Sequence, residues 1–192
     1  MMPTVLTKAS KQRRMMEFYN SISQHNMVYL AVGYSDQWVN NPGIPVETDD
    51  LDTYNTNILG YHTYKEILFA RPIANPTEEQ KDTCVYYKEV YYETISDYQQ
   101  ALDEGYTRIM CRFVLDKDEY FPVYMDEGAA MYNVLGMYIN VNPGDLSDVY
   151  YISPSDWNSR VTNKGTLELI STRGIITRSA DQAEDVVILL EF

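Results

Sequence analysis

The sequence predicts a mainly β fold of the α+β class: an antiparallel layered β-sandwich with two helices in its connecting segments. Apolar and polar residues alternate over 106–115 and 131–141, which is the period of half-buried strands. Helical patterns occur in only two clear segments, so the order of elements is not the regular β-α-β alternation of a parallel sheet. With 192 residues, 45% of them hydrophobic, the chain is expected to fold as a single domain over 1–192.

The first helix is expected from Ser10 to Ser23, with Ser10 as its N-cap. Its apolar residues recur at i, i+3, i+4 and i+7, which places them on one helix face: Met15, Phe18, Tyr19 and Ile22. The second helix is expected to begin at Ser96, which has capping-box spacing to Gln99, and to end at Gly105.

Strands are expected along most of the remaining chain, where β-branched and aromatic residues are frequent. The expected strands are 28–34, 83–92, 106–115, 131–141, 149–152, 167–171, 175–176 and 186–192. Residues 57–69 fit either a short helix or a strand, and 35–56 and 71–81 are expected to be connections. Six residues on the apolar sides of these strands are expected in the core: Ile109, Phe113, Leu135, Ile139, Ile188 and Leu190.

The charge of the chain argues against two classes of partner. Fifteen basic and 28 acidic residues give a net charge of −13, whereas nucleic acids and anionic membranes are bound by clustered Lys and Arg. No apolar run approaches the length of a membrane-spanning helix, and no signal peptide is expected. The 18 tyrosines favour both strand surfaces and protein interfaces, because Tyr offers a large, stiff and amphipathic contact area.

The sequence contains no motif that indicates catalysis. His25 and His62 lie in no metal-ligand spacing and near no nucleophile motif. The acidic clusters 49–52 and 116–119 lack the glycine of a calcium-binding EF-hand loop, so both are expected to be solvated loops. Cys84 and Cys111 are expected to be small buried apolar residues in strands. We therefore expect no catalytic, cofactor-binding or metal site, and no enzymatic activity.

Four aromatic residues are candidate interface anchors: Trp38, Trp157, Tyr150 and Tyr151. Burial in the fold and a role as sugar-binding platforms are the alternatives for the two tryptophans. Trp157 follows the turn-like stretch 153–156 and is therefore expected to be the more exposed of the two.

Three blocks of the sequence resemble the baseplate wedge proteins of T4-type contractile-tailed bacteriophages, in particular the dimeric peripheral wedge subunit. They cover less than half of the chain and occur in the same order as in that family. The first comprises Thr7-Lys8, the segment 16–22 (MEFYNSI) and the segment 28–38 (VYLAVGYSDQW). The second comprises 120–122 (YFP) and 134–143 (VLGMYINVNP), and the third is the C-terminal segment 165–192.

This resemblance implies a structural subunit of the virion tail baseplate, assembled in the cytoplasm of the bacterial host. It implies a layered β-sandwich, a homodimer, and contacts with other wedge proteins or tail-fibre attachment proteins. The family relative is longer, and this chain is expected to be a shortened form that lacks much of its middle. The alternative function is that of a carbohydrate-binding or glycan-hydrolysing sandwich, because acidic residues and aromatic residues line many sugar clefts.

Overall fold

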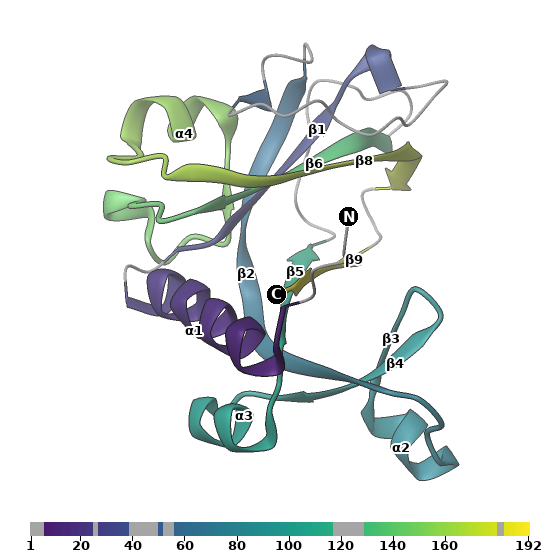
Figure 1. Cartoon of the computed structure of the whole chain (residues 1–192). Helices are drawn as coiled ribbons and strands as arrows, with labels where there is room; N and C mark the ends of the chain where they lie inside the picture. Colours follow the sequence, from purple (N-terminus) through teal and green to yellow (C-terminus); the bar gives the residue numbers. More distant parts are fainter. Residues whose placement is uncertain (1–5, 25–26, 39–49, 52–55, 117–128, 180–182) are drawn as a thin grey trace, which may run out of the picture. The chain divides into compact units, whose positions relative to one another are not determined.

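The computed structural model describes residues 6–24, 27–38, 50–51, 56–116, 129–179 and 183–192. The chain is divided into two compact units (Figure 1). Unit 1 comprises residues 1–21, 65–112 and 187–192, and unit 2 comprises 22–64 and 113–186. Strands predominate in the described residues, and every pairing given below by residue is antiparallel. The mainly β class is confirmed, whereas the layered sandwich and the single domain stay predictions.

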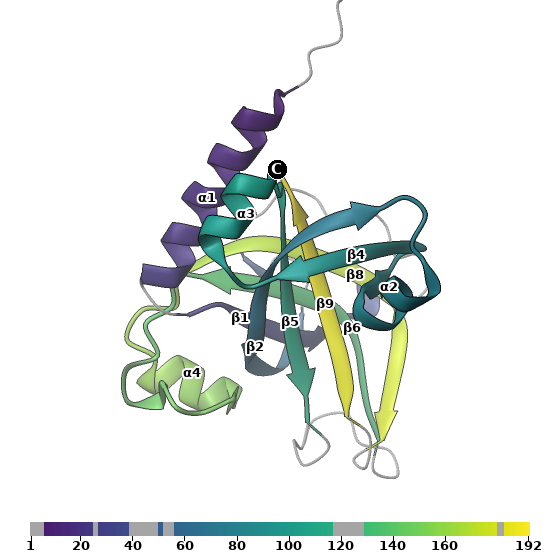
Figure 2. The same ribbon diagram turned by 90° about the horizontal axis from the view of Figure 1, so that it is seen from below.

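Unit 1 combines helices with a sheet. Its elements are parts of α1 (Lys8–Gln24), β2 (Asn57–Ile73), β5 (Arg108–Leu115) and β9 (Glu184–Glu191), and all of α2 (Glu78–Thr83), β3 (Val85–Tyr87), β4 (Val90–Ile95) and α3 (Tyr98–Glu104). β4 pairs with β3 and β2, and β5 pairs with β2 and β9. Helices α1 and α3 lie side by side (Figure 2). Gln12 Nε2 of α1 donates a hydrogen bond to Leu102 O of α3 at 2.8 Å.

Helix α1 begins earlier than its sequence pattern predicts. Ser10 N donates a hydrogen bond to Thr7 Oγ1 at 3.2 Å, so Thr7 and not Ser10 satisfies the free amide groups of the first turn. The predicted apolar face is correct within unit 1. Met15 is buried, and the ring of Tyr19 lies 4.8 Å from that of Phe69, between ring centroids.

The segment predicted as one strand over 83–92 is instead a hairpin. Lys88 and Glu89 both have left-handed backbone angles, with φ of 47° and 65°, and Tyr87 pairs with Val90 across them. Two successive left-handed residues form the two-residue turn that matches the twist of paired strands. The turn contains neither Gly nor Asn, and this is why its sequence resembles continuous strand.

The connection predicted over 71–81 is also partly wrong. Residues 57–69, which the sequence left open between helix and strand, belong to β2, and this strand continues to Ile73. Helix α2 follows, with a capping box in which Thr77 and Gln80 bond to each other's backbone amide groups. In α3 the N-cap is Asp97 and not Ser96, because Asp97 accepts a hydrogen bond from Gln100 N at 2.6 Å.

Helix α3 ends as predicted. Gly105 adopts the left-handed conformation, with φ of 77°. Its amide group donates to the carbonyl groups of Ala101 and Leu102, the usual way in which the last carbonyls of a helix are satisfied.

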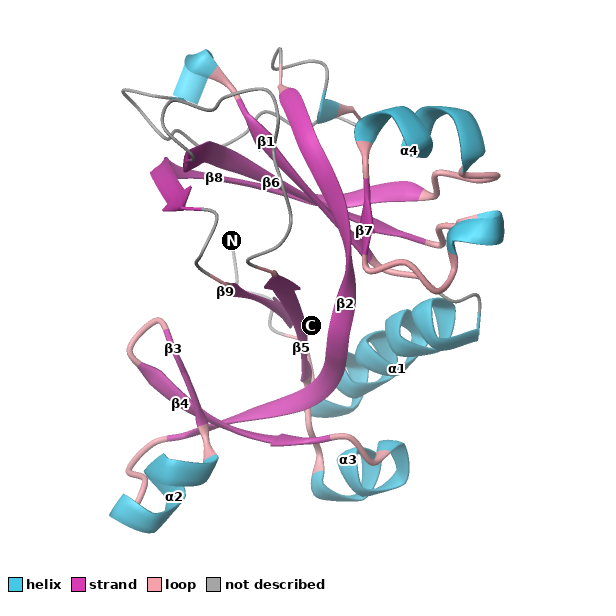
Figure 3. Cartoon of the chain, turned by 180° about the vertical axis from the view of Figure 1, so that it is seen from behind, coloured by secondary structure: helices cyan, strands magenta, loops and turns pink. Residues whose placement is uncertain are grey.

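Unit 2 contains the longest strand pairings. Its elements include β1 (Tyr29–Tyr34), β6 (Ala129–Ile139), β7 (Tyr151–Ile152), β8 (Thr166–Ser179), helix α4 (Pro154–Arg160) and the short 3-10 helices η1 (Asp36–Trp38) and η3 (Gly144–Leu146). β1 pairs with β2 and β6, and β6 pairs in turn with β8 (Figure 1). β7 pairs with β2, and helix α4 follows β7 directly in the chain (Figure 3).

Strand β8 is continuous where the sequence predicted two short strands, 167–171 and 175–176. Its pairing with β6 shifts register twice. Tyr132 pairs with Ile176 but Val134 with Thr172, and Met137 pairs with Leu169 but Tyr138 with Leu167. At each shift β8 carries more residues than β6, which is the signature of a bulge. Gly174 lies within the first shift, and this position explains why the pattern was interrupted there.

Five of the six predicted core residues are buried: Ile109, Phe113, Leu135, Ile139 and Ile188. Leu190 is only half-buried, so its predicted burial is wrong. Leu190 shares the face of the buried residues Val186 and Ile188, but it is the second-last residue of β9, and a strand end is covered less completely than its middle. β6 differs from its predicted one-sided pattern, because residues 132–137 are buried without interruption.

Candidate functional site

Trp157 lies in the aromatic centre of unit 2. Ser153 caps α4 by accepting a hydrogen bond from Asp156 N at 3.1 Å, and Pro154 occupies the first turn, where its missing amide proton costs nothing. The helix places the Trp157 indole parallel to the ring of Tyr61, with centroids 3.8 Å apart and an angle of 4° between the planes. Only 2% of Trp157 is exposed. Of the alternatives open for Trp157, burial in the fold is therefore the one the structure shows, and its exposure relative to Trp38 stays untested.

The sequence contains a signal for the helix that carries Trp157, although not for the burial of its indole. Ser153-Pro154 followed by Asp156 is a helix start, with an N-cap, a proline in the first turn and an acidic residue near the helix N-terminus. The same residue types are frequent in turns, so the stretch was interpreted as a turn that left Trp157 at the surface.

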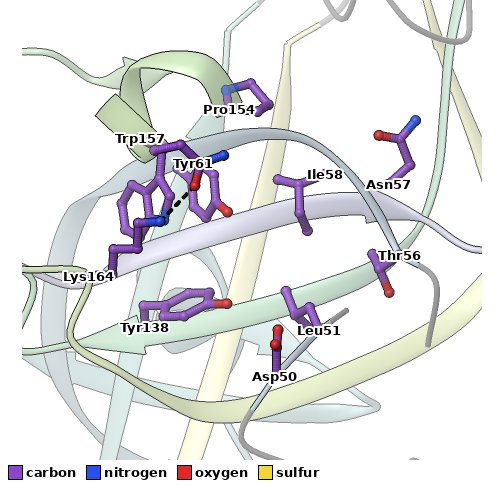
Figure 4. A pocket seen from close by; sticks show the side chains of 11 residues that line it. Asp50, Leu51, Thr56, Asn57, Ile58, Tyr61, Tyr138, Pro154, Trp157 and Lys164 are labelled. Atoms are coloured by element: carbon purple, nitrogen blue, oxygen red, sulfur yellow. Dashed lines mark hydrogen bonds between the residues drawn. The ribbon is translucent and has the colours of Figure 1, made fainter. Parts of the chain in front are cut away.

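A cleft of about 480 Å³ lies beside this aromatic centre. Figure 4 shows Trp157, Tyr61 and Tyr138 on one side of it and Leu51 and Ile58 on the other. The remaining lining residues in the described part of the chain are Asp50, Thr56, Asn57, Pro154, Asn158 and Lys164. Lys164 Nζ donates a hydrogen bond to Asn158 Oδ1 at 2.7 Å, drawn as the dashed line. The cleft thus combines aromatic rings with amide, hydroxyl, carboxylate and ammonium groups.

The described lining supplies fewer carboxyl groups than glycan hydrolysis uses. Glycoside hydrolases need two carboxyl groups on opposite sides of the scissile bond. Among the described lining residues, Asp50 is the single carboxylate. His62 does not line the cleft; it is buried in β2, and its ring lies 5.3 Å from that of Tyr151. The described residues of the cleft can bind a polar molecule, but they contain no acid–base pair.

Tyr150 and Tyr151 are adjacent in the chain but differ in environment. Tyr150 is 71% exposed and stands next to Val149, which is 40% exposed. The Tyr151 hydroxyl donates to Leu59 O at 3.1 Å, and its ring covers Gly60 so closely that a Cβ there would lie 2.1 Å from Tyr151 Cε2. Tyr150 is therefore a surface group, whereas Tyr151 is part of the packing against β2.

A shallow hollow of about 290 Å³ adjoins Tyr150. Its described lining is Met27, Thr63, Tyr64, Ser147, Asp148, Val149 and Tyr150. Thr63 N donates to Tyr150 O at 2.9 Å, which ties the backbone of the loop to β2 and so fixes the position from which the Tyr150 ring projects. We call Val149, Tyr150 and the lining of this hollow the tyrosine surface. Trp38, the fourth candidate anchor, belongs to η1, and its side chain lies outside the described part of the structure.

A second exposed tyrosine was not singled out from the sequence. Tyr86 in β3 is 59% exposed and faces Tyr91 of β4, with ring centroids 4.6 Å apart. This pair sits on one face of the hairpin, and no sequence signal could reveal it while 83–92 was interpreted as a single strand. Unit 1 therefore presents its own aromatic surface pair.

A charged cluster joins neighbouring strands in each of the two units. In unit 1, Arg71 of β2 lies opposite Glu93 of β4, and Arg71 Nε donates to Glu93 Oε2 at 3.2 Å. The hydrogen bond from Arg71 lowers the pKa of the Glu93 carboxyl. In unit 2, the guanidinium of Arg173 lies over the ring of Tyr132, 4.6 Å from its centroid, and the Tyr132 hydroxyl donates to Glu184. These clusters join strands, and neither lines a described cleft.

The described residues contain no group of three or more His, Cys, Asp or Glu side chains placed to hold a metal ion. Burial raises the pKa of the Cys111 thiol to about 12, and Cys84 is half-buried just after α2 and not within a strand. His25 lies outside the described residues, as do residues 49 and 52 of the first acidic cluster, 117–119 of the second, and the segment 120–122. Among the helices that the structure describes, none has the length and apolarity needed to cross a membrane.

Comparison with known proteins matches almost the whole chain to one protein family. Residues 5–192 match a protein-family model described as "Baseplate wedge 3 tail fiber network component". This match includes nearly all of unit 1 and all of unit 2. No curated protein matches the sequence.

Proposed function

Because the chain belongs to the family of baseplate wedge 3 tail fiber network components, we propose that it is a non-enzymatic scaffold of a phage tail baseplate. In this role it holds partner proteins in place through protein–protein interfaces. The partners are other wedge proteins, tail-fibre attachment proteins and a second copy of the chain. The protein acts in the virion, after assembly in the cytoplasm of the host bacterium.

The tyrosine surface is the observation that carries this proposal. Tyr is among the residue types enriched at interface hot spots, because burial of the ring removes a large apolar area from water without loss of its hydrogen-bonding hydroxyl. Tyr150 projects from a backbone that is tied to β2 by the Thr63–Tyr150 hydrogen bond. A backbone that is already held in place loses little conformational freedom when a partner covers the ring.

The net charge of −13 restricts which surfaces can meet. Two acidic copies repel each other unless their contact is apolar or salt screens the charge. A homodimer therefore uses apolar, tyrosine-rich contacts, and hetero-partners offer basic or apolar surfaces. The homodimer, the contractile tail and the relation to a longer T4-type wedge subunit rest on the resemblance of the three sequence blocks.

The scaffold proposal is tested in phage particles. Baseplates are purified from phage that encode the unmodified chain, Tyr150→Ala or Tyr86→Ala, and their protein composition is measured by quantitative mass spectrometry. We expect the unmodified chain at a fixed ratio to the other baseplate proteins. Tyr150→Ala should lower that ratio or release a partner, while the melting temperature of the purified variant stays unchanged.

Tyr86→Ala is the matched control, because it removes a tyrosine that is also exposed but belongs to the hairpin of unit 1. Absence of the unmodified chain from purified baseplates would overturn the scaffold role. Equal incorporation of all three chains, with all partners retained, would remove the tyrosine surface as the interface.

Self-association is a separate measurement. Sedimentation velocity of the purified chain over a range of salt concentrations should show a dimer that is strengthened by salt, since screening weakens the repulsion between acidic copies. A monomer at every concentration and salt level would contradict the homodimer.

A further inference from the structure

We propose that the cleft between α4, β2 and β6 in unit 2 binds a neutral mono- or disaccharide. This inference is independent of the scaffold role, because it concerns a different part of unit 2 from the tyrosine surface. It rests on the residues that line the cleft, on their charge balance and on one buried hydroxyl.

The size and surface of the cleft fit a small polar ligand. Its volume of about 480 Å³ is in the range of small-molecule sites. Polar groups make up most of its accessible lining, so a large apolar ligand would leave many of them without hydrogen bonds. A saccharide has both kinds of surface that the cleft offers: hydroxyl groups around its edge and carbon-bound hydrogens on its ring faces.

The aromatic side of the cleft provides for the ring faces. Tyr138 is half-buried and lies edge-on to Trp157, with ring centroids 5.7 Å apart. Trp157 is itself covered by Tyr61, so its indole supports the site and does not act as the platform. In Figure 4 Tyr138 extends along the cleft toward Leu51, and its ring forms part of the wall that a ligand would meet.

The charges of the lining select an uncharged ligand. The described lining contains one carboxylate, Asp50, and one ammonium group, Lys164. An anion would be attracted by Lys164 but repelled by Asp50, and a cation would meet the opposite pair of forces. A neutral molecule with hydroxyl groups can donate to Asp50 and accept from Lys164 without either repulsion.

The hydrogen-bonding groups at the rim are held in place. Lys164 donates one proton to Asn158 Oδ1, so two protons of the ammonium group and the amide protons of Asn158 remain for a ligand. Asn57 adds a second side-chain amide. Amide groups both donate and accept, and they therefore suit the paired hydroxyl groups of a sugar.

Thr56 supplies an independent observation. It is 7% exposed, and its hydroxyl oxygen has no hydrogen-bond partner among the described residues. Its methyl group lies against Gly33, where an added Cβ would come within 2.6 Å of Thr56 Cγ2. A buried hydroxyl without a partner costs free energy and needs an explanation. The oxygen itself is buried, so a ligand hydroxyl in the cleft reaches it only after rotation of the Thr56 side chain, and that rotation would supply the missing hydrogen bond.

The proposal is tested with ligand-observed saturation-transfer NMR on the full unmodified chain, with glucose, galactose, N-acetylglucosamine and maltose as separate probes. Glucuronic acid serves as the charged comparison. We expect saturation transfer to at least one neutral saccharide at millimolar concentration, the affinity range of a small polar site, and weaker transfer to glucuronic acid. No transfer to any neutral probe, or transfer to glucuronic acid alone, would overturn the proposal.

Two variants then locate the binding. Lys164→Met keeps the length of the side chain and removes the ammonium group, and we expect about tenfold weaker affinity from the loss of charged hydrogen bonds. Lys65→Met makes the same change at an exposed position of β2 outside the described lining, and it should bind as the unmodified chain does. Equal affinity of the two variants, with unchanged melting temperatures, would place the saccharide elsewhere.

Trp157 offers a readout inside the site itself. The chain has two tryptophans, so Trp38→Phe leaves Trp157 as the sole indole fluorophore. Its emission should shift on addition of the saccharide that gives saturation transfer. An unchanged emission spectrum in a folded Trp38→Phe chain that still gives saturation transfer would contradict binding beside the aromatic centre.

Discussion

Replacement of Trp157 by Ala should destabilise the protein strongly, because its indole is the centre of the aromatic packing in unit 2. The side chain is 2% exposed and contacts the rings of Tyr29, Tyr61 and Tyr138. A large aromatic side chain buries about 200 Å². At about 25 cal/mol per Å², its burial contributes about 5 kcal/mol relative to full exposure in water.

The measurable loss is smaller than this figure. The unfolded chain already buries part of its apolar area, and neighbouring side chains relax partly into a cavity. We therefore expect Trp157→Ala to lower the free energy of unfolding by about 3–5 kcal/mol. With a urea dependence of about 2 kcal/mol per M, the midpoint of unfolding falls by about 2 M.

The assay is urea denaturation followed by far-ultraviolet circular dichroism, since removal of Trp157 also removes its fluorescence. Tyr150→Ala is the matched control, because it truncates an aromatic residue of the same unit that is 71% exposed. Its free energy of unfolding should change by less than about 0.5 kcal/mol. Equal midpoints for Trp157→Ala and the unmodified protein would refute the reasoning, because the Tyr61 stack would then contribute nothing to stability.

Three further perturbations follow from the packing and the charges. Gly60→Ala places a Cβ 2.1 Å from the Tyr151 ring and should lower the thermal midpoint. The double variant Gly60→Ala/Tyr151→Ala should lose less stability than the sum of the two single losses, because the clash is gone. Full additivity of the losses would show that the clash is not the cause. The Arg71 guanidinium lowers the pKa of Glu93, so the stabilisation is present above the unfolded pKa and is lost as pH falls through the folded one. The unmodified chain should be more stable than Arg71→Met by less than about 1 kcal/mol, because this ion pair is partly exposed. That difference in stability should shrink in acid. Growth of the difference in a pH series of denaturation curves would contradict the assignment. Deletion of 185–192 removes the strand that pairs with β5 and should cause aggregation, measured by light scattering; a soluble truncated chain with an unchanged melting curve would show that β9 is dispensable.

Elements with a strong hydrophobic period were predictable from the sequence. The apolar face of α1, the alternation in β5 and the glycine that ends α3 each depend on residues close together in the chain. These local signals agree with the packing that surrounds them. The segment 57–69 was ambiguous because its apolar residues fit two periods, and only the pairing of β2 with β1, β4 and β7 decides for a strand.

The candidate site was much less predictable. Trp157 was expected at the surface, since the sequence cannot show that Tyr61, almost a hundred positions earlier, stacks on it. Thr56 and Lys164 carry no motif, and their place in one cleft depends on the long-range pairing of β6 with β8 and on the position of α4. Tyr150 and Tyr151 stay candidate anchors; the first is exposed, whereas the inward packing of Tyr151 depends on Gly60, whose missing side chain makes room for the ring.

The two register shifts of β8 have a consequence for a protein that belongs to a large assembly. β8 is a 14-residue strand that pairs with β6 alone among the described strands, so one of its sides is not used by them. Long, regular edges recruit further strands without limit, and identical subunits at high local concentration could then grow into fibres. Bulges interrupt the ladder of amide and carbonyl groups along such a side. The register shifts therefore make this side of β8 a poor template for strand addition by another copy of the chain.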